Sequence, residues 1–122
     1  MPRYTHTALA LSGSYPALQP AADSLDLAMT AADATNKEQV VLTGKQILVW
    51  HNTSAATPRT VTITSIADGG HKRSGDVTTY SVAAGEYGAF GPVEIDGWRQ
   101  TDGNLYFEAS HAEVKFGVLR LP

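Results

Sequence analysis

Cysteine is absent from this sequence of 122 residues. Its absence excludes disulfide scaffolds, cysteine–zinc sites and cysteine nucleophiles. Charged residues are also few, since Asp, Glu, Lys and Arg make up 17% of the chain and give a formal net charge of −3. Proteins that bind nucleic acid by neutralising phosphates normally have a basic excess. We therefore expect no nucleic-acid partner.

Long apolar runs are missing as well. No stretch approaches the ~18 apolar residues that a membrane-spanning helix needs, so we expect no membrane partner. Near the N-terminus the longest apolar run covers residues 8–11, which is too short for the core of a signal peptide. We expect the chain to act in the compartment in which it is made.

The remaining composition supports one compact domain. Hydrophobic residues make up 43% of the chain. A chain of this length buries roughly two-thirds of the surface that its unfolded form exposes, which is enough for a core without disulfides.

The first 24 residues differ in composition from the rest. Pro2, Pro16 and Pro20 rule out a regular helix or a central strand there, because proline lacks an amide donor and fixes φ. The segment nevertheless contains several apolar side chains, namely Tyr4, Leu9, Leu11, Tyr15 and Leu18. We therefore predict an extended N-terminal arm over residues 1–24, lying on its own body or on a neighbour, and a β-sandwich domain over residues 25–122.

Short β-like segments separated by turn residues fill the second part of the chain. The clearest covers residues 59–66, where Val61 and Ile63 alternate with threonines. Residues 46–52 are almost continuously apolar, and Asp-Gly pairs at 96–97 and 102–103 indicate turns. Further strands are predicted at 25–30, 77–82, 86–90, 93–95, 104–109 and 113–121. Only residues 31–38 offer one helical turn, so the pattern indicates an all-β antiparallel sandwich or barrel.

The apolar positions at period two predict the core of this domain. They are Val61, Ile63, Tyr80, Val82, Leu105, Phe107, Phe116 and Val118.

Groups that could carry chemistry are present but are not arranged in a motif. His111 and Glu113 form the one local His–carboxylate pair, and no third metal ligand accompanies them. We expect no metal and interpret the four histidines as surface or rim residues; they are His6, His51, His71 and His111. Glu94, Asp96, Asp102 and Glu108 could form a glycosidase-type pair, but acidic residues are common beside turns. No G-x-S-x-G motif is present, and we expect neither an enzyme nor a cofactor.

Two further clusters could bind a ligand or a partner. His71, Lys72 and Arg73 are the one basic concentration and lie in a glycine-rich loop that leads into no helix. Trp98 follows a turn, and together with other aromatic residues it could form a platform for a sugar or pack at the edge of the core. The other aromatic residues are Tyr87, Phe90 and Tyr106.

Several stretches together resemble the head decoration, or cement, proteins of tailed bacteriophages. They are residues 30–34 (TAADA), 44–54 (GKQILVWHNTS), 61–63 (VTI), 82–86 (VAAGE), 90–92 (FGP), 102–103 (DG) and 114–121 (VKFGVLRL). The resemblance runs from about residue 28 to the C-terminus, and the first 25 residues have no counterpart in it.

The resemblance implies a structural protein of the virion. Many such proteins are β-sandwiches, some with jelly-roll topology, that are made in the host bacterial cytoplasm and attach to the capsid surface as oligomers. The expected partners are the major capsid protein and other copies of this chain, as a dimer or trimer at a capsid symmetry site. Candidate interface residues are Tyr4, Leu9, Leu11, Tyr15, Leu18, His71, Lys72, Arg73 and Trp98. The alternative is a lectin-like or host-adhesive β-sandwich displayed on a virion.

Overall fold

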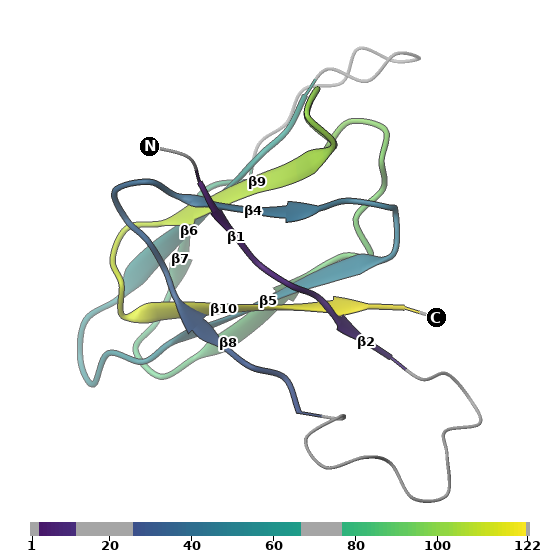
Figure 1. Cartoon of the computed structure of the whole chain (residues 1–122). Coiled ribbons are helices and arrows are strands. Elements are labelled where there is room, and N and C mark those ends of the chain that lie inside the picture. The colour runs from purple at the N-terminus through teal and green to yellow at the C-terminus, as the bar shows by residue number, and fades with distance from the viewer. Residues whose placement is uncertain (1–2, 12–25, 67–76, 122) are drawn as a thin grey trace, which may run out of the picture.

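The computed structural model describes residues 3–11, 26–66 and 77–121, which form ten strands and no helix (Figure 1). The strands are β1 (Tyr4–Thr5), β2 (Leu9–Ala10), β3 (Thr30–Ala31), β4 (Glu38–Val41), β5 (Gln46–Asn52), β6 (Arg59–Thr64), β7 (Val77–Val82), β8 (Tyr87–Phe90), β9 (Asn104–Ala109) and β10 (Val114–Arg120). The predicted all-β fold is confirmed.

The strands form two sheets that pack as a β-sandwich, as predicted. One sheet has the order β1-β4-β9-β6-β7, and the other has the order β2-β10-β5-β8 with β3 also paired to β10. Pairing is antiparallel except at β1 and β2, which run parallel to β4 and β10. The purely antiparallel arrangement that was predicted therefore holds for β3 to β10 but not for the two N-terminal strands.

Strands β3 to β10 pair in a nested order. β6 pairs with β7, β5 with β8, β4 with β9, and β3 with β10. This is the pairing of one long hairpin whose two arms have been folded over together. Two additional pairings, β10 with β5 and β6 with β9, join the folded arms into the two sheets.

The core lies between the sheets and matches the period-two prediction closely. Seven of the eight predicted residues are buried: Val61, Ile63, Val82, Leu105, Phe107, Phe116 and Val118. The prediction for Tyr80 is wrong, because its side chain is 54% exposed. Tyr80 lies on β7, which ends its sheet, so no outer strand covers it. Thr79 beside it has a left-handed φ of 47°, and the register between β6 and β7 shifts at this point.

Three segments differ locally from the sequence prediction. Residues 93–95 form no strand, because the chain turns there and Arg99 N–H donates to Ile95 O. The helical turn predicted within residues 31–38 is limited to residues 33–37, where Lys37 N–H donates to Asp33 O at 2.7 Å. The Asp33 carboxylate also accepts hydrogen bonds from the backbone N–H groups of Thr35 and Asn36, and this turn leads into β4. The strand predicted from residue 25 is reduced to β3, and Leu27 lies against Gly117 of β10.

Candidate functional site

The predicted interface residues fall in separate parts of the chain. Tyr4, Leu9 and Leu11 belong to the N-terminal segment, residues 3–11. Trp98 lies in the connection between β8 and β9. The remaining predicted interface residues lie outside the described residues: Tyr15, Leu18, His71, Lys72 and Arg73.

The N-terminal segment joins the edges of both sheets (Figure 1). Tyr4 N–H donates to Lys37 O and His6 N–H to Gln39 O, which adds β1 to the first sheet. The chain then crosses to the second sheet, where Leu11 N–H donates to Arg120 O. The described part of the predicted arm, residues 3–11, thus lies along its own body, which was one of the two positions that the sequence left open.

Side chains reinforce this attachment. The Arg3 guanidinium donates to the backbone oxygen of Glu38 at 3.1 Å and lies 4.0 Å above the ring of Tyr106. Gln39 Nε2 donates to Thr5 Oγ1 at 3.0 Å. The segment is therefore held by its backbone and by two side chains, one just before β1 and one at its end.

The side chain of His6, in the middle of this segment, is buried, so the prediction that the histidines are surface or rim residues is wrong for His6. Its side chain is 6% exposed, and its ring lies 5.3 Å from that of Phe107 and 6.2 Å from that of Phe116, between ring centroids. Burial lowers the pKa of His6 to about 4, since the charged form would lose its hydration. The imidazole is neutral at neutral pH, and its Nε2 has no hydrogen-bond partner among the described residues.

Glu38 is a second buried ionisable group on the same side of the sandwich. It is 0% exposed, and its Oε1 accepts a hydrogen bond from Asp33 N–H. Its Oε2 has no hydrogen-bond partner in the part of the chain that the structure describes. Burial raises the pKa of Glu38 to about 7, against the opposing effect of the Asp33 hydrogen bond. Glu38 occupies an inward position of β4, opposite Phe107 of β9. Sequence analysis missed it because a single acidic residue at a strand start gives no signal of burial.

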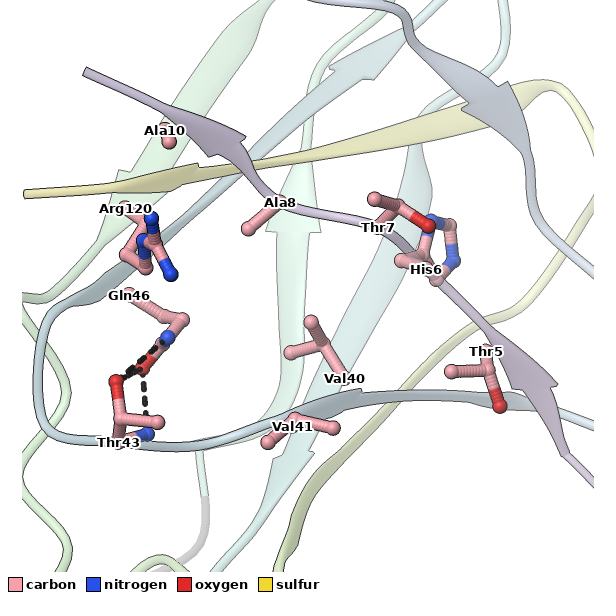
Figure 2. A pocket seen from close by; sticks show the side chains of 10 residues that line it. All are labelled: Thr5, His6, Thr7, Ala8, Ala10, Val40, Val41, Thr43, Gln46 and Arg120. Atoms are coloured by element: carbon pink, nitrogen blue, oxygen red, sulfur yellow. Dashed lines mark hydrogen bonds between the residues drawn. The ribbon is translucent and has the colours of Figure 1, made fainter. Parts of the chain in front are cut away.

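A cleft of about 400 Å³ opens between the N-terminal segment and the end of β4 (Figure 2). Figure 2 shows Ala8 on one side and Val40 and Val41 on the other, with His6 at one end and Arg120 at the opposite end. The remaining lining residues are Thr5, Thr7, Ala10, Thr43 and Gln46. No carboxylate lines this cleft among the described residues.

Among the described residues, the backbone N–H and C=O of Val41 have no hydrogen-bond partner on the cleft side. Leu42 N–H donates to Gly103 O, on the side of β9. Alternate residues of a strand direct their backbone groups to the same neighbouring strand, so those of Val40 point toward β9 as well. Val41 lies between them and directs its N–H and C=O the other way. β1 covers β4 only as far as Gln39, so this short stretch of strand edge is left open.

One cation lies at the far end of the cleft, and a second lies in the hollow beside it. Arg120 lines the cleft, and the neighbouring hollow of about 360 Å³ is lined by Thr43, Lys45, Arg120 and Leu121. Neither the Arg120 guanidinium nor the Lys45 ammonium has a hydrogen bond or ion pair with another described residue. The side chain of Gln46, in contrast, is hydrogen-bonded within the turn before β5. Its Oε1 accepts from Thr43 N–H at 2.7 Å, and its Nε2 donates to Thr43 Oγ1 at 2.9 Å.

The aromatic residues do not form one platform. Trp98 is half-buried and packs edge-on against Phe90, with 5.0 Å between ring centroids. Tyr87 lies on the opposite face of β8 from Phe90, and its ring stacks on that of His51 with 3.8 Å between centroids. The ring of Tyr106 lies beneath the Arg3 guanidinium. The structure therefore brings together only one pair of the four aromatic residues singled out from the sequence.

Four of the candidate catalytic and metal-binding residues are engaged in local contacts. Glu113 binds Arg59 at 2.6 Å and lies 3.6 Å from His111. Asp102 accepts a hydrogen bond from the Tyr106 hydroxyl at 2.5 Å, and Glu108 pairs with Lys37 at 3.4 Å. Within residues 3–11, 26–66 and 77–121, no three His, Asp or Glu side chains gather in a way that could hold a metal ion.

Comparison with known proteins adds no relative. No protein-family model matches the chain, and neither a curated protein nor a solved structure does so. In the described part of the chain, no helix has the length and apolar character to cross a membrane.

Proposed function

We propose that this chain is a structural virion protein that binds the outside of a phage capsid and cements neighbouring major capsid subunits. The proposal starts from the sequence resemblance to head decoration proteins. It is carried by one observation on the fold, which is the exposure of apolar side chains along the N-terminal edge of the sandwich.

That edge has the properties of a contact surface. Tyr4 is 45% exposed, Leu11 37% and Val41 57%, and all three lie where the N-terminal segment meets β4 and β10. Each sheet ends here in a strand of only two residues. Short edge strands leave backbone groups open to a partner, and grouped apolar side chains on a surface favour contact with another protein.

The nested strand pairing supports a jelly-roll topology for this protein. A jelly roll is a long antiparallel hairpin rolled into two sheets, and β3 to β10 pair in that order. Jelly rolls are common among viral capsid and lectin domains. The topology is therefore compatible with the proposed function and also with the adhesive alternative, so it does not decide between them.

The chain would act as a homo-oligomer on the virion surface. Capsid lattices offer two-fold and three-fold sites, and a dimer or trimer of this chain would match such an axis. Several weak contacts made at once by one oligomer give an avidity that one contact cannot.

The test is co-sedimentation of the purified protein with shells assembled from the major capsid protein of the phage that would carry it. We expect saturable binding by the wild-type chain and weaker binding by the double variant Tyr4→Ser, Leu11→Ser. Tyr87→Ser is the matched control, because it removes an exposed tyrosine from β8. Absence of saturable binding by the wild type would contradict the proposal, and glycan binding without capsid affinity would support the adhesive alternative.

A further inference from the structure

The cleft beside Val41 has an open strand edge. The Val41 N–H and C=O point into the space where β1 would continue if the chain did not cross to the second sheet. An extended peptide placed there would pair with β4 in the position that β1 leaves, which is the geometry of β-strand addition. A compact small molecule would not use both groups in this way.

The walls of the cleft suit alternate side chains of such a peptide. Ala8 and Val40 present small apolar groups toward the space between them (Figure 2). In an extended peptide, successive side chains point to opposite faces. One set of side chains would therefore contact this apolar wall while the other set remained toward solvent.

The positive charge at the end of the cleft favours an acidic group on the bound peptide. Arg120 and Lys45 have no carboxylate partner among the described residues, and His6 at the other end is neutral at neutral pH. A guanidinium holds a carboxylate through two parallel hydrogen bonds, which gives direction as well as attraction. Charge complementarity thus favours a peptide with a carboxylate near its end.

We propose that this cleft binds an extended peptide segment, which pairs with the free backbone edge at Val41 and places a carboxylate on Arg120. The inference rests on the proposed function only for the source of that peptide, which would be an acidic segment of the major capsid protein. The binding chemistry itself does not depend on that source.

The test uses a blocked six-residue peptide of alternating threonine and valine that ends in two glutamates, titrated into the full chain to millimolar concentration. Amide NMR signals should shift at Val41 and Thr43, and hydrogen exchange of the Val41 amide should slow. Arg120→Gln should weaken binding about tenfold, because a charge-assisted hydrogen-bond pair is lost. Lys115→Gln, an exposed cation on the same strand, is the matched control and should leave binding unchanged.

Two further probes separate a peptide site from a simple anion site. The same peptide with N-methylated amides should bind weakly, because it cannot pair with the strand edge. Acetate and inorganic phosphate alone should not slow exchange at Val41. Equal binding by the wild type and Arg120→Gln, equal binding of the N-methylated peptide, or no shift at Val41 would each overturn the inference.

The two proposals fail in different ways. If the peptide binds but capsid shells do not, the peptide site stands and the capsid function is wrong. If shells bind while the peptide fails to shift Val41, the capsid function stands and the peptide site is wrong.

Discussion

The buried pair His6 and Glu38 dominates the chemistry of this protein at the scale of single residues. Both pack near Phe107, and both carry a buried polar atom that has no hydrogen-bond partner within residues 3–11, 26–66 and 77–121. Burial moves the pKa of His6 down to about 4 and the pKa of Glu38 up to about 7. Each group therefore favours its neutral form in the folded protein.

These opposite shifts predict opposite pH dependences of the free energy of unfolding. Between pH 4 and 6.5 the unfolded chain binds the His6 proton and the folded chain does not, so His6 makes stability rise with pH. Between pH 4.5 and 7 the folded chain keeps the Glu38 proton and the unfolded chain loses it, so Glu38 makes stability fall with pH. Around pH 5–6 the two effects oppose each other.

We expect single variants to separate these effects. Glu38→Gln should gain stability relative to the wild type by about 1–3 kcal/mol as the pH rises from 4.5 to 7. The amide remains neutral and can still accept from Asp33 N–H. His6→Leu should show the opposite trend. Its free energy of unfolding should rise relative to that of the wild type as the pH falls from 6.5 to 4, because the wild type loses stability over this range and the variant does not. Urea unfolding at half-unit pH steps measures both trends.

The nearby ionisable groups provide the controls. Arg3, Asp33 and Glu108 act on Glu38 through their charges, and they are retained in both variants. Glu108→Gln changes one of these charges without touching the buried carboxyl, so it should leave most of the pH trend in place. A difference between Glu38→Gln and the wild type that does not change between pH 4.5 and 7 would contradict the assignment.

Residue-scale features of the site were the part that sequence could not supply. The alternation of apolar residues predicts which positions of a regular strand face inward, and it was right at Phe107 and Phe116. His6 lies in an irregular segment where no period exists, and Arg120 lines the cleft only because β10 ends beside the N-terminal segment. Such features depend on long-range contacts, which local sequence patterns do not contain.

At the scale of elements, the long strands were predictable and the short ones were not. β5, β7 and β9 have the predicted bounds, because turn residues bracket clear apolar or β-branched runs. β1, β2 and β3 have only two residues each. Strands this short form because a neighbouring strand presents a free edge, so their own residues carry little signal.

One pairing between elements depends on the absence of a side chain. Gly88 of β8 lies opposite Trp50 of β5, and a Cβ atom at Gly88 would overlap the Trp50 indole. We expect Gly88→Ala to destabilise the fold by about 1–3 kcal/mol, the usual cost of overpacking, and to alter the Trp50 fluorescence. Ala89→Ser, on the exposed side of the same strand, should change neither. Unchanged stability of Gly88→Ala in thermal unfolding would mean that the indole can move aside freely.

At the scale of the whole molecule, the N-terminal segment connects the two sheets along one edge of the sandwich (Figure 1). Removing residues 1–11 would break the Tyr4–Lys37, His6–Gln39 and Leu11–Arg120 backbone hydrogen bonds and uncover Phe107 and Phe116. Each such hydrogen bond contributes about 1 kcal/mol, so we expect a loss of at least ~2 kcal/mol and a lower Tm by calorimetry. Removing residues 1 and 2 alone is the control and should leave the Tm unchanged. If the longer truncation kept the wild-type Tm, residues 3–11 would contribute nothing to the stability of the sandwich and would be available in full for binding a neighbour.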